Sequence, residues 1–230
     1  RTNRGPISED EEVARLLPFL KAWPQLVNRA VPADEVQLWP PLLSVNTWRS
    51  GVVRRVLLEG GDLLNDIRAL PDADNARLCA RHGAALLIMH SVGRPKVPHT
   101  HVGYPDVMGT LTSFFEEKVQ LALGAGLSRD QIVIDPGIDF AKQKDDNLTI
   151  YRELHRLHRW RRPILLPVSR KTVIGDVLGL PDPNGRDAGT VACIAAGMRS
   201  GAHLFRVHNV RAAFQAVKTL WAVSKAPVTE

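Results

Sequence analysis

The sequence predicts an α/β fold, a (β/α)₈ TIM barrel in which parallel strands alternate with helices. Short apolar runs alternate with stretches of helical periodicity repeatedly along the chain. The apolar runs are continuous, as expected of parallel strands that are covered on both faces. No G-x-G-x-x-G turn follows a strand, which disfavours the alternative architecture, a doubly wound open sheet.

The elements follow in a regular order. Ser8 and Glu11 form a capping box, and the apolar residues behind it recur at helical spacing, which predicts a first helix. A short apolar run then ends at Asn46 and is followed by helical spacing from Val52. The later strand–helix units begin at the apolar runs 63–64, 84–89, 131–134, 163–168 and 203–207.

The chain contains fewer strand–helix units than the eight of a complete barrel. Six strand–helix units preceded by an orphan helix give eight if the first strand, first helix and second strand are missing from this chain. We therefore expect an N-terminally incomplete barrel that forms a single domain over residues 1–230.

Composition excludes several classes of protein. Hydrophobic residues make up 44% of the chain and charged residues 23%, the balance of a globular domain, and the longest apolar runs have strand length, which predicts no membrane partner. The net charge of +6 favours anionic partners, but the densest basic stretch, 152–162, falls in the last turns of a predicted helix, where cations complement the helix dipole. We expect no nucleic acid partner. Cys79 and Cys193 lack metal-ligand spacing and indicate reduced thiols in a cytoplasmic protein.

Functional groups follow each predicted strand. In a (β/α)₈ barrel, chemistry is carried at the C-terminal ends of the strands. In chain order the residues found there are Asn46; Asn65 and Asp66; Met89 and His90; Asp135, Pro136 and Gly137; Ser169, Arg170 and Lys171; Arg206 and His208.

Each of these residues also has a structural interpretation. Asp135 could start a turn, and Asn65 could cap the following helix. Lys171 and Arg206 are harder to explain in this way, because a charge directly after an apolar strand needs a partner or a ligand. The C-terminal rim of the predicted barrel would carry a carboxylate, amides, a lysine and an arginine. Such a set of groups can bind a flat heterocycle together with an anion. Asp135 would accept two hydrogen bonds from adjacent ring N–H groups, and Arg206 with His208 would cradle a phosphate.

The same segments, read as strings, resemble dihydropteroate synthases over essentially the whole chain. The order of the motifs is more specific than any one of them. They are LLNDI at 63–67, LLIMHS at 86–91, DPGIDFAK at 135–142, SRKTVIG at 169–175, GT at 189–190 and RVHNV at 206–210.

The resemblance implies a reaction, in which p-aminobenzoate displaces pyrophosphate from 6-hydroxymethyl-7,8-dihydropterin pyrophosphate during folate biosynthesis. It implies catalytic roles for Lys171, Asp135 and Arg206, and a cytoplasmic homodimer that forms through the last helices. Leu220, Trp221 and Val223 could serve that interface, although packing onto the barrel is the favoured use of these residues. The family is the target of sulfonamides, but the sensitivity of this chain depends on the loops that are absent from it and stays open. Pterin binding is implied for Asn46, Asn65, Ile67, Met89, Asp135, Phe140 and Lys171. Pyrophosphate binding is implied for Arg206 and His208, and p-aminobenzoate binding for Thr172, Lys171 and Phe140. Mg²⁺ is implied as cofactor, with its ligand in the missing N-terminal segment and no metal ligand visible in this chain.

Three positions depart from the family pattern. Asn46 stands where the family has an aspartate, so a negative charge near the pterin is lost, and Asp139 and Ala141 stand where the family has glycines. Asn46 and Asp139 keep one alternative open, an impaired paralogue that binds pterin without making dihydropteroate. A pterin-dependent methyltransferase on the same barrel is another alternative, and Lys171 and Thr172 argue against it because they match the synthase pattern. A scaffold role is a further alternative for any barrel.

Overall fold

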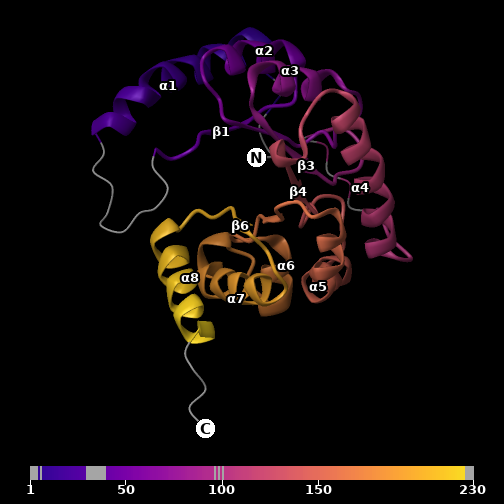
Figure 1. Cartoon of the computed structure of the whole chain (residues 1–230). Helices are drawn as coiled ribbons and strands as arrows, with labels where there is room; N and C mark the ends of the chain where they lie inside the picture. Colours follow the sequence, from indigo (N-terminus) through magenta and orange to yellow (C-terminus); the bar gives the residue numbers. More distant parts are fainter. Residues whose placement is uncertain are drawn as a thin grey trace. The chain divides into compact units, whose positions relative to one another are not determined.

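The computed structural model describes residues 5, 7–29, 40–95, 97, 99 and 101–225. By the contacts between residues, the chain divides into two compact units. The first unit comprises residues 1–89, 94–97 and 117–133, and the second comprises residues 90–93, 98–116 and 134–230. Figure 1 shows the elements of both units in chain order.

The first unit is built around a parallel sheet. Its elements are α1 (Glu9–Arg29), β1 (Ser44–Asn46), α2 (Ser50–Leu58), β2 (Leu63–Asp66), α3 (Asp74–His82) and β3 (Ala85–Met89). The sheet has the order β1-β2-β3-β4, and β1 pairs with β2 so that Asn46 lies opposite Asn65. The predicted cap of the first helix is present, because the Glu11 N–H donates to Ser8 Oγ at 3.1 Å. A core cluster joins α1, β1 and α2 through Val13, Leu20, Val45, Val52 and Val56.

Helix α4 (Val107–Gly124) and strand β4 (Ile132–Asp135) each contribute residues to both units, and a 3₁₀ turn, Arg129–Gln131, precedes β4. The remaining elements belong to the second unit. They are α5 (Lys144–Glu153), a 3₁₀ segment Leu154–Trp160, β5 (Leu165–Leu166), α6 (Thr172–Leu178), a 3₁₀ turn Pro183–Arg186, α7 (Asp187–Arg199), β6 (Leu204–Phe205) and α8 (Val210–Lys225).

Strands β5 and β6 pair in parallel, and a parallel bridge between Ile134 and Ile164 links β4 to the segment before β5. Helix α7 packs closely on the β5–β6 pair. A Cβ on Gly197 would lie 2.8 Å from the Phe205 ring and 2.9 Å from a Leu166 methyl, so only a glycine permits this approach.

The structure confirms an α/β fold with parallel strands in the predicted order. The six strands of the described residues form sheets of four and two strands, which do not close into a barrel. Strands β5 and β6 are shorter than the predicted runs 163–168 and 203–207; β5 stops before Pro167, which has no N–H to continue the ladder. The single-domain organisation stays a prediction. Within the described ranges, no helix combines the length and the hydrophobicity needed to cross a membrane.

Candidate active site

The turn after β4 holds a buried carboxyl group. Asp135 ends the strand, is 2% exposed, and its Oδ1 accepts the Gly137 N–H at 2.7 Å. Its backbone carbonyl accepts the His90 N–H at 2.9 Å, beyond the end of β3. Gly137 has a φ of 72°, and a Cβ there would lie 1.9 Å from the His90 carbonyl oxygen. The turn therefore requires glycine at this position.

Burial and neighbouring cations act on Asp135 in opposite directions. Burial raises the pKa of its carboxyl to about 6, while the Gly137 N–H and the charges of Lys171, Lys142 and Arg206 lower it. The Gly137 N–H occupies only one of the acceptor positions of the Asp135 carboxylate, so the carboxylate gains from a ligand that donates further N–H groups.

Lys171 belongs to the same cluster as Asp135. It is the residue just before α6, and its Nζ donates to the Ile138 carbonyl at 2.7 Å. The ammonium also lies 5.0 Å from the centre of the Phe140 ring. Burial lowers the pKa of Lys171, and the charges of Asp139 and Asp135 oppose that shift. The structure thus brings together Asp135, Phe140 and Lys171, three residues that the sequence predicted to contact one ligand.

Lys142, which the sequence interpretation did not single out, links backbone carbonyls of the loop after β4. Its buried Nζ donates to the carbonyls of Gly137 (3.0 Å) and Phe140 (3.1 Å) and lies 2.8 Å from His90 Nδ1. Burial lowers the pKa of Lys142 to about 7 and that of His90 to about 3. His90 is therefore neutral at physiological pH, and its Nδ1 shares a hydrogen bond with Lys142 Nζ. The only sequence signal for Lys142 is its place at the end of the DPGIDFAK segment.

The two residues that replace family glycines adopt glycine-like backbones. Asp139 has a φ of 65° and Ala141 a φ of 50°, both in the left-handed region. The Asp139 carboxylate accepts the N–H groups of Thr172 and Val173 at the start of α6. It also accepts from Asn147 Nδ2 at 3.3 Å, while the Asp139 N–H donates to Asn147 Oδ1 at 2.9 Å.

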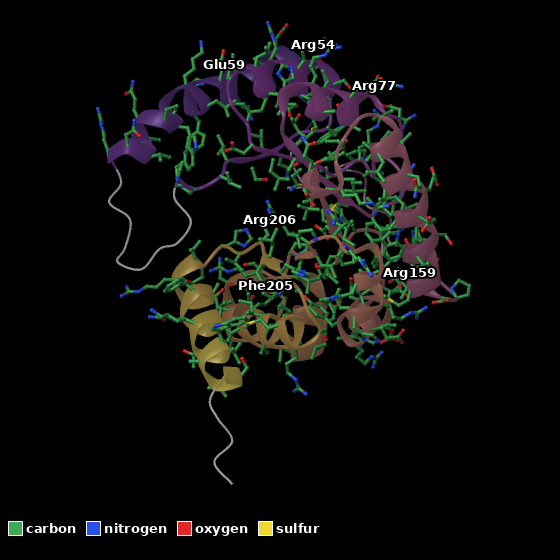
Figure 2. All side chains as sticks on the ribbon, viewed as in Figure 1. Arg54, Glu59, Arg77, Arg159, Phe205 and Arg206 are labelled. Carbon is green, nitrogen blue, oxygen red and sulfur yellow. The ribbon has the colours of Figure 1, made fainter. Side chains whose placement is uncertain are left out.

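The residues predicted to bind pyrophosphate follow β6. The Arg206 N–H donates to the Leu166 carbonyl at 3.1 Å, and its exposed side chain lies near enough to Asp135 to lower that residue's pKa. Figure 2 labels Arg206 beside Phe205 on the second unit. His208 contacts the loop between β5 and α6, since its Nδ1 lies 2.7 Å from Ser169 Oγ. Arg170 instead bonds both carboxylate oxygens of Asp187, at 2.8 and 3.3 Å.

The other predicted pterin contacts belong to the first unit. Asn46 and Asn65 are register partners at the ends of β1 and β2, and Met89 is buried at the end of β3. Asn65 is 7% exposed, and its buried Oδ1 has no hydrogen-bond partner among the described residues. An orphaned buried amide oxygen is costly, so it indicates a ligand or water there. Ile67 follows directly after β2 and is half-buried.

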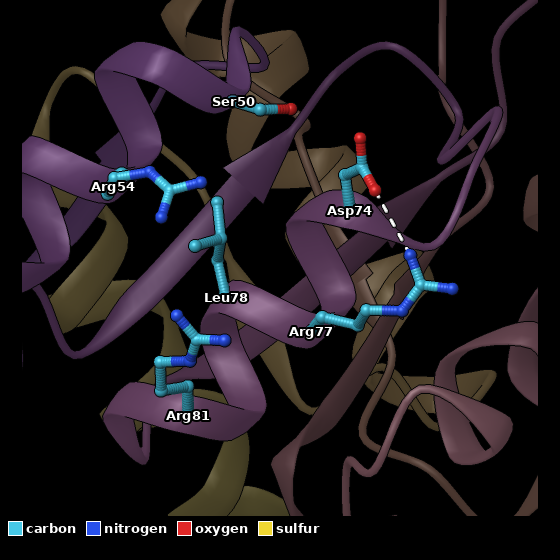
Figure 3. A pocket seen from close by; sticks show the side chains of 6 residues that line it. All are labelled: Ser50, Arg54, Asp74, Arg77, Leu78 and Arg81. Atoms are coloured by element: carbon cyan, nitrogen blue, oxygen red, sulfur yellow. Dashed lines mark hydrogen bonds and ion pairs between the residues drawn. The ribbon is translucent and has the colours of Figure 1, made fainter.

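A shallow pocket of about 200 Å³, open to solvent, lies elsewhere on the first unit, between α2 and α3 (Figure 3). It is lined by Ser50, Arg54, Asp74, Arg77, Leu78 and Arg81, none of which is a predicted site residue. Arg77 already pairs with Asp74 at 3.1 Å.

The described residues contain no ready-made cluster of metal ligands. No three acidic, histidine or cysteine side chains gather as a ligand set within the ranges that the structure describes. Mg²⁺ is usually held by one or two carboxylates together with substrate phosphates and waters, and no chemical step below is assigned to it.

The sequence model of the pterin binding enzyme family matches residues 1–208. This chain belongs to the pterin binding enzyme family. A dihydropteroate synthase from Synechocystis is 35% identical over 96% of this chain and 74% of its own length. One from Escherichia coli is 29% identical over 98% of this chain and 76% of its own length.

Solved structures of pterin binding enzymes share the fold. Dihydropteroate synthase from Stenotrophomonas maltophilia has a TM-score of 0.87 at 28% identity and covers 97% of this chain and 80% of its own. The enzyme from Thermus thermophilus in complex with 4-aminobenzoate has a TM-score of 0.85 at 34% identity, over 97% of this chain and 81% of its own. The fold class of this family member is therefore that of the TIM-barrel synthases.

Proposed function

We propose that this chain is a transferase of folate biosynthesis that joins 6-hydroxymethyl-7,8-dihydropterin pyrophosphate to p-aminobenzoate and releases pyrophosphate. The relatives named dihydropteroate synthase support this activity, as do solved relatives in complex with 6HMPPP and with 4-aminobenzoate. The observation that carries the proposal is the cluster that Asp135 and Phe140, in the segment after β4, form with Lys171, the residue before α6.

The pterin contacts follow from the chemistry of that cluster. The Asp135 carboxylate accepts the adjacent N–H groups of the amino-pyrimidine edge, a charge-assisted contact. Lys171 donates to a ring acceptor, and Phe140 forms an apolar wall. Asn65, with its unpartnered buried Oδ1, stays a predicted pterin contact. Asn46, Ile67 and Met89 complete the set of proposed pterin contacts.

The reaction transfers the pterin methylene from oxygen to nitrogen. The carbon–oxygen bond breaks, and its electron pair leaves with pyrophosphate, which Arg206 and His208 hold. The amine nitrogen of p-aminobenzoate forms the new carbon–nitrogen bond and then loses a proton. Asp135 stabilises the positive charge that develops on the pterin, so catalysis is largely electrostatic and positional. Thr172, Lys171 and Phe140 are the proposed contacts of p-aminobenzoate.

The wider context is proposed in the same way. We place the protein in the cytoplasm as a homodimer, with small-molecule substrates and neither nucleic acid nor membrane as partner. A requirement for Mg²⁺ and sensitivity to sulfonamides stay predictions. Both are open to the assay that tests the activity.

That assay measures pyrophosphate release by the full-length protein with the pterin pyrophosphate, with and without p-aminobenzoate. We expect release that depends on the amine and is lost in Asp135→Ala. Amine-independent release, or none at all, would reject the synthase activity.

One observation favours a second candidate, a pterin-binding paralogue without synthase activity. Asn46 removes one negative charge from the predicted pterin site, and the carboxylate of Asp139 is already engaged by Thr172 and Val173. Pterin binding without turnover would indicate this paralogue. Turnover that rises in Asn46→Asp would show instead that the lost charge only slows the synthase.

A further inference from the structure

Asp139 occupies a set of donors that the proposed reaction assigns to a substrate. Its carboxylate accepts the backbone N–H of Thr172 and, at 3.2 Å, that of Val173. Thr172 is the residue proposed to receive the carboxylate of p-aminobenzoate. The chain thus supplies an internal carboxylate at the place where an external one is expected.

The contacts around Asp139 hold it in this position. Asn147 pairs with it reciprocally, through the Asp139 N–H at 2.9 Å and through Asn147 Nδ2 at 3.3 Å. Asn147 is itself 2% exposed, and its Nδ2 also donates to the Gln143 carbonyl at 3.0 Å. Displacing the carboxylate therefore breaks contacts with both α5 and α6.

The charge of Asp139 acts on the same substrate group. Lys171, the nearby cation, has Asp139 as the first of the charges that raise its pKa, so part of its positive field is already compensated. A substrate carboxylate arriving at Thr172 meets occupied donors, a like charge and a partly neutralised lysine. A neutral substituent in the same place meets none of these penalties except the occupied donors.

We propose that Asp139 is a specificity-determining residue that reduces selection for a carboxylate on the amine substrate, so that the chain accepts neutral para-substituted arylamines. This inference rests on the proposed function, and it extends that function to a class of second substrate. It also accounts for why a residue with a side chain stands at a left-handed backbone position, where glycine carries no conformational cost.

The test compares p-aminobenzoate with p-aminobenzamide, which has nearly the same size but no charge. For each amine, kcat/KM is measured with the pterin pyrophosphate, and the ratio of the two values is the readout. In Asp139→Gly we expect the ratio to shift toward p-aminobenzoate by about tenfold, because two backbone donors are freed and a like charge is removed. Glycine suits the φ of 65°, so this variant is expected to fold.

Two further variants separate the charge from the backbone change. Asp139→Asn keeps an oxygen acceptor but removes the charge, and should shift the ratio part of the way. Ala141→Gly makes the same substitution at the other left-handed position, φ 50°, and should leave the ratio at the wild-type value. An equal shift in Ala141→Gly and Asp139→Gly would assign the effect to loop flexibility and overturn the inference.

The same ratio is measured as binding, by titrating each amine into the pterin-loaded and pyrophosphate-loaded protein. An unchanged ratio in Asp139→Gly overturns the role of Asp139 while the synthase activity stands. A shifted binding ratio with no pyrophosphate release from any variant supports the role of Asp139 and rejects the synthase activity. The two proposals therefore fail in different experiments.

Discussion

Asp135 is the residue on which ligand recognition depends most. Its buried carboxylate is the proposed acceptor for two pterin N–H groups, and hydrogen bonds to a charged group contribute about 1.5–3 kcal/mol each. We predict that Asp135→Ala lowers pterin affinity by about 100-fold or more, measured by calorimetric titration. Asp176→Ala, which removes an exposed carboxylate from α6, should leave the affinity within about twofold of wild type.

The raised pKa of Asp135 predicts an acid limb in pterin binding. Only the carboxylate accepts both N–H groups, so affinity should fall as pH drops through about 6, the pKa that burial gives this group. Its contribution to stability runs the other way. Because the folded pKa lies above the ordinary value of 3.8, protonation favours the folded state, and this contribution is lost as pH rises through about 6.

Because pterin binding and stability change with pH in opposite directions, a titration can tell the two effects apart. Weaker binding at pH 5 cannot come from Asp135 destabilising the fold, since protonated Asp135 stabilises it. Titrations between pH 5 and pH 8 would show the effect, and Asp135→Asn should remove the acid limb near pH 6 along with most of the affinity. Lys142, whose pKa is about 7, still titrates in that variant. A wild-type affinity that does not vary over this range would contradict a carboxylate contact.

Residue-level reasoning found the strand-end groups but missed their loop partners. Asp135 and Lys171 follow apolar runs, so the position alone marks them. Lys142 and the capping contacts of Asp139 lie in a loop with left-handed residues, where no periodicity reports which side chain turns inward. Such contacts depend on backbone geometry that single residues in a sequence do not encode.

At the scale of elements, the loop between β4 and α5 stores conformational strain. Ala141 has a φ of 50°, a region that costs a residue with a Cβ about 1 kcal/mol. We predict that Ala141→Gly raises the free energy of unfolding by about 0.5–1 kcal/mol in urea denaturation. Ala192→Gly, inside α7, is the matched control and should lower it by about 1 kcal/mol.

The turn between α6 and α7 depends on one buried arginine. The guanidinium of Arg186 donates to the carbonyls of Leu180 (2.9 Å), Pro181 (2.7 Å), Arg170 (3.2 Å) and Lys171 (3.1 Å). Arg186 is 7% exposed, so its removal leaves buried acceptors without donors.

We predict that Arg186→Met lowers the free energy of unfolding by about 3 kcal/mol and weakens pterin binding, because two of the four carbonyls flank the Lys171 side chain. Denaturation and titration of the same sample measure both effects. The control is Arg199→Met, which alters an exposed arginine in the last turn of α7 and should change neither quantity appreciably. If Arg186→Met loses stability but keeps the wild-type pterin affinity, Arg186 does not position Lys171 for pterin binding.

The sequence predicts well which buried segments form strands, and it predicts poorly where helices end. The runs ending at Asn46 and Asp135 appear as β1 and β4 because continuous apolar residues need cover on both faces. The helix whose last turns are predicted over the basic stretch 152–162 is α-helical only to Glu153 and continues as 3₁₀ turns to Trp160. Both forms bury the same apolar residues, so the pattern does not distinguish them.

At the scale of the whole molecule, chain order was predictable and closure was not. Alternating apolar runs and helical periods fix the sequence of strand–helix units, and TM-scores of 0.83 to 0.87 with solved relatives agree with that order. Closing a barrel depends on strand number and stagger, which are properties of all the strands together. The six strands of the described residues form open sheets, so the local pattern of this chain predicts its units better than their assembly.

The proposed homodimer is a prediction about the last helix. On α8, Val210, Phe214 and Trp221 are 66%, 64% and 57% exposed and recur at helical spacing, so they share one face. Large apolar groups gathered on one face favour association, and a stable interface buries about 800 Å² from each partner. The face must then extend beyond these side chains. Val223 is also 69% exposed, but it lies two residues after Trp221 and therefore on another side of the helix.

We predict a dimer in sedimentation velocity at micromolar concentration and a monomer for Phe214→Asp, because a buried, unpaired carboxylate is costly at an interface. Val177→Asp places the same charge on an exposed residue of α6, 56% exposed, and should leave the dimer intact. Phe214 is already exposed in the single chain, so its substitution should leave the thermal unfolding of the separated subunit unchanged while abolishing association. A dimer that survives in Phe214→Asp would place the interface away from α8.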